Sequence, residues 1–252
     1  MSAGHRGGEM SVTESAPPVQ QRGRWPGPIR LRRGWARADA RPWNDRTPDA
    51  NLRIVRGGAS FLDACTAWLI ANGAPSVLSP PLGSGAARKW ESVGYQRSVP
   101  LTLMRLELAQ PVPAPNHLVV SDDVVLDDLL RIDHIAFDDF WQFDRVGLEE
   151  AINATSNART LTIRGPEADP VAYAVIGLGH AISYLQRLAV HPDWQRSGMG
   201  RSLVRASVRV ARTAGTRAMV LNTQQENEAA IRLYASEGFV TQPESLTVFR
   251  RS

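Results

Sequence analysis

The feature that most restricts how this chain can fold is a glycine-rich turn at residues 195–202. The turn reads Gln-Arg-Ser-Gly-Met-Gly-Arg-Ser, and it lies between an apolar run at residues 188–190 and a stretch with helical spacing of apolar residues at 199–213. A turn of this kind exposes backbone N–H groups at the helix N-terminus, where they bind anions. The segment therefore predicts a strand, an anion-binding turn and a helix in direct succession.

The alternation of strands and helices continues on both sides of this turn. Apolar residues with a period of two or of 3.6, separated by Gly and Pro, mark the expected elements. Strands are expected at 118–120, 159–163, 171–178, 183–190, 219–221 and 246–249, and helices at 124–137, 148–154, 199–213 and 227–236. This order predicts an α/β fold (α+β in some schemes), with a mostly parallel or mixed sheet and helices on both faces.

The composition is that of a globular protein with a sizeable core. The 252 residues are 43% hydrophobic, and the single cysteine, Cys65, excludes an internal disulfide and a multi-cysteine metal site. The sequence opens without an apolar signal segment, and no run approaches the ~18 apolar residues that span a membrane. We therefore expect a cytoplasmic protein without a membrane partner.

Proline and charge divide the chain into an arm, a linker and two folded parts. Residues 1–50 hold nine arginines against five acidic residues and are rich in Pro and Gly, which predicts a disordered or irregular basic arm. The proline-dense segment 110–116 predicts an extended linker between folded parts at 51–109 and 117–252. A solvated tail is favoured over an arm that binds nucleic acid, so we expect no nucleic-acid partner.

The two folded parts share residues in the same order. At an offset of 144 positions, the aligned pairs are Ala86 with Ala230, Arg88 with Arg232, Ser92 with Ser236, Gly94 with Gly238 and Tyr95 with Phe239. At an offset of 142, they are Gly58 with Gly200, Ser60 with Ser202 and Gly73 with Gly215. We interpret this order as an internal duplication in which residues 51–109 are a truncated copy.

The turn at 195–202 lacks the signatures of two common phosphate sites. It has no Gly-Lys-Ser/Thr ending of a P-loop, and it does not fit Gly-x-Gly-x-x-Gly with an acidic residue about 20 positions later. Gly198 and Gly200 permit positive φ and a close approach of the ligand, and Arg196 and Arg201 flank the turn. The turn therefore suits a diphosphate held without a metal ion, and no metal site is expected.

Residues on both sides of the turn resemble the GNAT superfamily of acyl-CoA-dependent N-acyltransferases. The resemblance rests on Leu-Ala-Val-His-Pro at 188–192, Gln-Arg-Ser-Gly-Met-Gly at 195–200, and Asn227, Ala230, Leu233, Tyr234, Gly238 and Phe239 at the family's spacing. It covers about 130 residues, from 117 to the end. It implies the GNAT fold, a splayed mixed sheet of about seven strands with flanking helices, and acetyl-CoA as the acyl donor.

The resemblance also implies which residues bind the coenzyme. In the family, the strand before the turn offers amides to the pantetheine arm and thioester, and the turn binds the pyrophosphate. The cofactor-binding residues implied here are Leu188, Ala189, Val190, Gln195, Arg196, Ser197, Gly198, Met199, Gly200, Arg201, Ser202, Asn227 and Tyr234. Tyr234 also occupies the position of the tyrosine that commonly protonates the thiolate, whereas Asn227 equally suits a helix N-cap.

The general base is the least determined catalytic group. An alkylamine with a pKa near ~10 must lose a proton before it attacks a thioester. Some members of the family carry a glutamate six residues before the position of Val190, where this chain has Tyr184. Tyr184 is our second candidate catalytic residue, and an ordered water chain past Tyr184, Ser183 or Gln186 is the alternative.

Residues 121–150 are strongly acidic, with ten Asp and Glu from Asp122 to Glu150 against two Arg. In the family this region builds the acceptor side of the cleft, and negative charge there attracts a cationic amine. Asp138, Asp139 and Asp144 are interleaved with the aromatic residues Phe137, Phe140, Trp141 and Phe143. Acidic and aromatic groups together suit a positively charged amine with an apolar body. A carboxylate here is a further candidate base, whereas His180 is interpreted as a surface residue.

The first folded part departs from the family at both the turn and the acid. Tyr234 aligns with Trp90, which cannot protonate a thiolate, and the sequence around Gly57 and Gly58 lacks the family's pattern. The chain thus resembles tandem members of the superfamily, the mycothiol synthases among them, with a degenerate noncatalytic first half.

The leading hypothesis is an N-acetyltransferase that moves acetyl from acetyl-CoA to a primary amine, of a small molecule or a protein, by direct attack in a ternary complex. The alternative is an acyl-CoA-binding pseudoenzyme with a regulatory role. The acceptor, the acyl preference beyond acetyl and the oligomeric state stay open.

Overall fold

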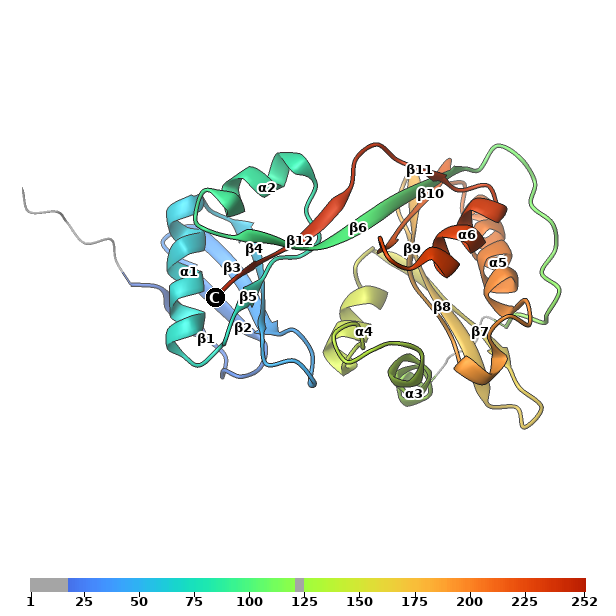
Figure 1. Ribbon diagram of the computed structural model, residues 1–252, viewed down its shortest axis with the longest axis horizontal. Helices are drawn as coiled ribbons and strands as arrows, with labels where there is room; N and C mark the ends of the chain where they lie inside the picture. Colours follow the sequence, from blue (N-terminus) through green and yellow to red (C-terminus); the bar gives the residue numbers. More distant parts are fainter. Residues whose placement is uncertain (1–17, 121–124) are drawn as a thin grey trace, which may run out of the picture.

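The computed structural model describes residues 18–120 and 125–252. Two lobes lie side by side, and two strands, β6 (Gln96–Glu107) and β12 (Leu246–Arg251), run between them (Figure 1). Strands of the described part form one mixed sheet, in the order β1-β2-β3-β4-β5-β12-β6-β10-β9-β8-β7, with β11 paired to β6. Residues 1–17 of the predicted arm, and Asp122 and Asp123 of the acidic segment, lie outside the described residues.

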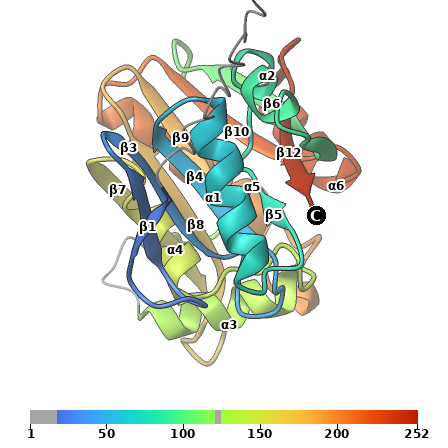
Figure 2. The ribbon, with the colours of Figure 1, turned by 90° about the vertical axis from the view of Figure 1, so that its left-hand side faces the viewer.

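The first lobe is built from residues 20–91. Its elements are β1 (Gln20–Arg22), β2 (Ile29–Arg33), β3 (Ala36–Pro42), β4 (Ala50–Arg56), α1 (Ala59–Ala71), β5 (Val77–Leu78) and α2 (Ser84–Glu91). Strands β1 to β4 pair antiparallel, and β5 joins β4 in parallel after the α1 crossover. Figure 2 shows α1 in front of these strands, and its Phe61, Leu62 and Leu69 are buried with Leu31 and Leu52 of the sheet.

The prediction of a disordered or irregular arm over residues 1–50 is wrong for the described part, because β1, β2 and β3 lie there. In β3, Ala36, Ala38 and Ala40 are buried and alternate with half-buried Arg37 and Asp39. The period-two pattern of a strand is therefore present in the sequence. Its apolar positions are alanines, which are weak strand formers, and burial under α1 compensates for that low propensity.

The second lobe has helices on both faces of its strands. Its elements are α3 (Leu126–Ala136), α4 (Arg145–Ile152), β7 (Asn157–Arg164), β8 (Pro170–Leu178), β9 (Ile182–Val190), a 3-10 turn (Pro192–Trp194), α5 (Met199–Thr213), β10 (Ala218–Gln224), α6 (Glu228–Ser236) and β11 (Val240–Thr241). Leu129, Ile132 and Leu148 of α3 and α4 pack on Tyr173. Helices α5 and α6 pack on the opposite face. No helix in the described part is long and apolar enough to cross a membrane.

Strands β6 and β12 tie the two lobes into one sheet. β6 follows α2 in the chain but pairs antiparallel with β10 of the second lobe, and β12 lies between β5 and β6. The linker at 110–116 runs beside α5, where Arg205 and Arg212 donate to the carbonyls of Ala114 and Gln110 at 3.3 and 2.8 Å. The mixed α/β architecture predicted from the sequence is confirmed.

Candidate active site

Strands β9 and β10 run together at their first residues and then separate. Ile182, Ser183 and Tyr184 pair with residues 218–220, but beyond Tyr184 β9 pairs with β8 and β10 with β6. The predicted splay of the sheet is therefore present at this place. It leaves the edge of β9 that faces β10 without a strand partner from residue 185 to 190.

Backbone groups of Leu188 and Val190 point into this opening. The amide of His191 donates to Val171 O on β8 at 2.9 Å, and alternate residues of a strand present their N–H and C=O groups to opposite edges. The carbonyl of Val190 accepts from the side chain of Gln195 at 3.3 Å, on the side away from β8. The amides of Leu188 and Val190 are thus directed at the gap, as a bound thioester requires.

A β-bulge lies in β9 where the gap between β9 and β10 begins. The register of β9 against β8 shifts between Leu185 and Arg187, so Gln186 is an extra residue on β9. Leu185 and Leu188 pack in the core beneath α5, and Arg187 reaches Asp133 of α3 on the other face.

The glycine-rich turn leads directly into α5. Gly198 is the N-cap of α5 with φ +90°, and Arg196 also has positive φ (+60°). The first amide that bonds back to the turn is that of Ser202, which donates to Gly198 O at 3.0 Å. The amides at 198–200 therefore have no partner in the helix and are available to an anion. A Cβ on Gly200 would lie 3.2 Å from Leu233 of α6, so Gly200 allows these helices to pack closely.

Some of the predicted coenzyme residues have exposed side chains, and others have buried ones. Gln195, Arg196 and Ser197 are exposed, whereas the side chains of Ala189 and Met199 are buried in the core, which leaves those two only their backbone groups.

Two of the predicted coenzyme side chains are already engaged elsewhere in the protein. The Ser202 hydroxyl, 1% exposed, accepts from the amides of Asn116 and His117 at 3.2 Å, and Arg201 pairs with Glu237 at 2.9 Å. The side chains of Ser202 and Arg201 thus already have partners on the linker and next to α6, and their place in the coenzyme site stays a prediction.

Asn227 and Tyr234 lie on α6 and face a cavity. Asn227 caps the helix, its Oδ1 accepting from the amide of Ala230 at 3.0 Å. Tyr234 is 8% exposed, and burial raises the pKa of its hydroxyl to about 12, against an opposing effect of the Arg187 charge. Because an unperturbed tyrosine has a pKa near ~10, this phenol is protonated at neutral pH and suits a proton donor.

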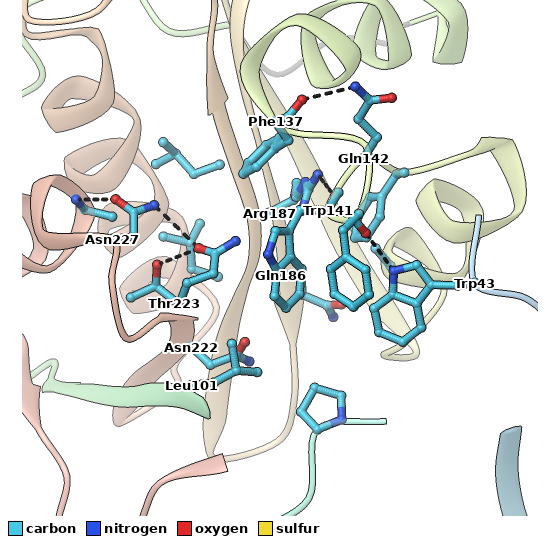
Figure 3. Close-up of a pocket in the computed structure, with 18 of the residues that line it drawn as sticks. Trp43, Leu101, Phe137, Trp141, Gln142, Gln186, Arg187, Asn222, Thr223 and Asn227 are labelled. Carbon is cyan, nitrogen blue, oxygen red and sulfur yellow. Dashed lines mark hydrogen bonds between the residues drawn. The ribbon is translucent and has the colours of Figure 1, made fainter. Parts of the chain in front are cut away.

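The cavity has a volume of about 420 Å³ and is lined by both halves of the chain. Figure 3 shows Asn222, Thr223 and Asn227 on one side and Trp43 and Gln142 on the opposite side. The first lobe contributes Arg41, Trp43, Asn51 and Pro81; the α3–α4 segment contributes Phe137, Phe140, Trp141, Gln142 and Phe143. Within residues 18–120 and 125–252, no group of three or more His, Cys, Asp or Glu is placed to hold a metal ion.

Tyr184, the second candidate catalytic residue, lies outside the cavity lining, and its catalytic role stays a prediction. Its side chain is 42% exposed and does not line the cavity. The reason is its place on β9: Tyr184 still pairs with Val220, so it precedes the point at which the strands separate. Ser183 is buried and bonds to Thr216 at 2.7 Å, which leaves Gln186 as the member of the predicted water path that lines the cavity.

The acidic residues singled out at 138–144 do not line the cavity, although their aromatic neighbours do. Asp138 caps the turn that precedes Trp141, Asp144 caps α4 by accepting from Gly147, and Asp139 is exposed. The expectation of acidic and aromatic groups around a cationic amine is therefore corrected. Among residues 18–120 and 125–252, the charged side chains in the lining are those of Arg41 and Arg187.

Arg187 forms a buried ion pair that sequence reasoning missed. Its guanidinium donates to both oxygens of Asp133 at 2.7 Å, and Asp133 also accepts from Tyr173 at 2.5 Å. The rings of Phe137 and Phe143 stack on its two sides, with centroids 3.6 and 3.9 Å from the guanidinium carbon. An arginine within the apolar run of a central strand was the signal in the sequence.

The first lobe also holds the α3–α4 segment in place, which the sequence did not indicate. The Trp43 indole N–H donates to Phe140 O at 2.6 Å, and the Asn44 amide donates to Asp139 O and Gln142 O at 2.8 and 2.9 Å.

Comparisons with known proteins agree with this geometry. The sequence model described as the acetyltransferase (GNAT) family matches residues 126–239. The chain is 43% identical over 61 residues to the mycothiol acetyltransferase of Nocardiopsis dassonvillei, which is 24% of this chain and 18% of that protein. It is 36% identical over 64 residues to the L-amino acid N-acyltransferase MnaT of Escherichia coli K12, which is 25% of this chain and 36% of that protein. The matches thus span less than two thirds of either relative.

The overall fold is similar to that of a solved tandem GNAT protein from the clavulanic acid biosynthesis pathway. The TM-score is 0.63 at 14% identity, over 89% of this chain and 82% of that one, which at this identity speaks for the fold alone. Residues 126–239 thus match the acetyltransferase (GNAT) family, and the open edge of β9 and the turn before α5 agree with that match.

Proposed function

We propose that this protein is an acyl-CoA-dependent N-acyltransferase that transfers acetyl from acetyl-CoA to a primary amine. One observation carries the proposal: the gap between β9 and β10 lies next to free amides at the start of α5 and to the buried hydroxyl of Tyr234. The match of residues 126–239 to the GNAT family supports the same class of reaction.

In this proposal, the turn and the open strand edge bind the donor. The amides at 198–200 and the positive end of the α5 dipole hold the pyrophosphate, assisted by the exposed Arg196. The amides of Leu188 and Val190 hold the pantetheine arm and polarise the thioester carbonyl. When bound, acetyl-CoA supplies an acyl group activated as a thioester.

The transfer then proceeds by direct attack. The amine nitrogen forms a bond to the acetyl carbonyl carbon, the carbon–sulfur bond breaks, and its electron pair passes to sulfur. Tyr234 gives its proton to the sulfur, and the proton released by nitrogen passes to water and restores the phenol. The pKa of about 12 supports this assignment, because it keeps the phenol protonated until sulfur needs the proton.

The proposal assigns different tasks to the two halves. Residues 117–252 are the catalytic domain, and the first half is a degenerate copy that does not transfer acyl groups. Trp90 at the position of Tyr234 supports this division. The first half still contributes Arg41 and Trp43 to the cavity.

The acceptor in this proposal is a small-molecule amine, and a protein amino group is the alternative. The two curated relatives are named for small molecules, mycothiol and an L-amino acid.

Isothermal titration calorimetry with acetyl-CoA tests the donor site. The wild-type protein should bind, and Gly198→Glu should weaken binding by ~100-fold or more, since it puts a carboxylate beside the phosphates at a position with φ +90°. Gly58→Glu is the matched control, because Gly58 is the N-cap of α1, has φ −90° and has no atom within 4 Å of an added Cβ.

Absence of binding by the wild-type protein, or equal binding by Gly198→Glu, contradicts the proposal. Binding without transfer to any member of a varied amine library would favour the acyl-CoA-binding pseudoenzyme.

A further inference from the structure

Trp43, Phe140 and Trp141 form an aromatic corner in the lining of the cavity. Trp43 stacks on Phe140 with centroids 5.0 Å apart and planes 23° apart, and Trp141 stands nearly perpendicular to Phe140 at 5.1 Å. All three residues line the cavity. Flat walls at right angles favour a flat apolar group over a flexible chain, because only a flat group contacts both walls.

The aromatic corner is held rigid by bonds between the two halves. The Trp43 indole N–H bonds to Phe140 O at 2.6 Å, and Arg41 donates to Glu150 of α4 at 2.9 Å. The guanidinium of Arg187 bonds to Trp141 O at 2.7 Å from beneath. A ligand that fits the corner therefore meets a preformed surface and loses little free energy in ordering it.

The charges around the cavity do not favour an ammonium group. The two arginines in its lining already use the adjacent carboxylates: Arg187 is bonded to Asp133, and Arg41 to Glu150. Arg187 already lies against one face of Phe137 and one face of Phe143. Within the described part of the lining, a protonated amine would lose its water without gaining a free carboxylate partner.

We infer that the acceptor of this enzyme is an amine on a flat apolar body whose nitrogen is uncharged at neutral pH, of the arylamine type. The inference rests on the proposed function and specifies its substrate. An uncharged nitrogen attacks the thioester carbon directly and needs no base to free its lone pair. The new amide forms as the carbon–sulfur bond breaks, sulfur takes the Tyr234 proton, and the nitrogen proton leaves to water.

Three amines of similar size separate shape from charge. Aniline is flat and uncharged at neutral pH, benzylamine is flat and protonated, and cyclohexylamine is neither flat nor uncharged. Their binding to the full-length protein in the presence of coenzyme A is measured by calorimetry, and their acetylation by release of free thiol from acetyl-CoA.

We expect aniline to bind at least tenfold more tightly than benzylamine, and benzylamine more tightly than cyclohexylamine. If cyclohexylamine binds as tightly as benzylamine or more tightly, the inference about shape is overturned. If benzylamine binds more tightly than aniline, the inference about charge is overturned.

A substitution in the corner tests its role directly. Trp43→Ala should raise the KM for aniline at least tenfold while leaving the affinity for acetyl-CoA within twofold. Trp35→Ala is the matched control, because Trp35 is 69% exposed between β2 and β3 and should change neither value. Trp43→Phe keeps a ring at the position and should retain most of the affinity if Trp43→Ala does not fold.

An unchanged KM for aniline in the folded Trp43→Ala protein overturns the assignment of the corner. Failure of the proposed function gives a different result: the wild-type protein then binds no acetyl-CoA, which the titration shows before any amine is added.

Discussion

In the first half of the chain the elements follow the order β2-β3-β4-α1-β5-α2, and in the second half the order β7-β8-β9-α5-β10-α6 repeats the same pairing. Each half has an antiparallel meander, a crossover helix, a parallel strand and a second helix. β4 pairs with the two-residue strand β5 only through its first residues, and β9 and β10 likewise pair only at their first residues.

The ends of the helices agree in detail at the offsets found in the sequence. Gly73 and Gly215 end α1 and α5 with φ +97° and +78°, and Gly94 and Gly238 end α2 and α6 with φ +86° and +91°. The aligned ring pairs also touch, Trp90 with Tyr95 at 4.7 Å and Tyr234 with Phe239 at 5.8 Å. These correspondences support the proposed duplication, and the element order shared by the halves begins at β2.

The halves differ at the start of the crossover helix and at one ring. α5 begins after left-handed Gly198, whereas α1 begins after extended Gly58, and the Gly57 carbonyl there accepts from Lys89 of α2 at 3.1 Å. Tyr234 has a hydroxyl where Trp90 has none. The halves thus share a scaffold, and the proposed chemistry depends on one turn and on the Tyr234 hydroxyl of the second half. The first half instead contributes Arg41 and Trp43 to the cavity lining.

The largest effect should come from removing the phenol. Tyr234→Phe should lower kcat by ~100-fold or more while the affinity for acetyl-CoA stays within about twofold, because a general acid acts only on the leaving sulfur. Trp90→Phe is the matched change in the first half and should leave kcat within about twofold. Thiol release and calorimetry measure the two quantities. Equal losses in both variants would end the assignment of catalysis to the second half.

A smaller effect should come from the two helix-ending glycines. Gly94→Ala and Gly238→Ala should each lower the free energy of unfolding by ~1–2 kcal/mol, because a Cβ is strained at positive φ. The loss should be larger for Gly238, since its Cβ would lie 3.3 Å from Leu106 Cδ1, compared with 3.8 Å from Arg251 Nε for Gly94.

Urea denaturation measures both glycine variants. Gly85→Ala is the control, because Gly85 lies inside α2 with no atom within 4 Å of an added Cβ, and the change should be neutral or stabilising. A stabilising effect at only one of Gly94 and Gly238 would break the equivalence of the two halves.

The smallest expected change is in the alkaline pH dependence. A general acid works while it is protonated, so kcat falls as the pH rises through its pKa. Because the pKa of Tyr234 is raised to about 12, kcat measured with saturating substrates should stay within about twofold between pH 8 and pH 10.5. If kcat falls by half near pH 10, burial does not raise the pKa of the Tyr234 hydroxyl as the structure implies.

Much of the donor site could be predicted because it is local. The strand at 183–190, the turn at 195–202 and the helix after it are contiguous, and their apolar periods and glycines specify them without distant contacts. Asn227 and Tyr234 follow from the spacing on one short helix. The strands at 20–42 were missed because alanine carries their buried pattern, and its burial depends on α1.

The acceptor site could not be predicted because it is assembled from distant segments. Trp43 meets Phe140 across almost 100 residues, and Arg187 meets Asp133 across 54. Tyr184 lies outside the cavity lining for a related reason: its distance from Val190 in sequence fits, but the strands separate only after it.

The resemblance of the second half to the GNAT family, the turn that suits a diphosphate and the position of Tyr234 could all be read from the sequence, because each depends on neighbours within one or two elements. The tertiary structure was needed to show that Asp138, Asp139 and Asp144 lie outside the cavity lining, whereas the rings of Phe137, Phe140, Trp141 and Phe143 belong to it. It also decided that β6 and β12 exchange between halves and that Trp43 closes the acceptor side. Which face of a segment lines the cavity depends on strand pairing and burial between residues far apart in the sequence, and a local sequence pattern does not contain this information.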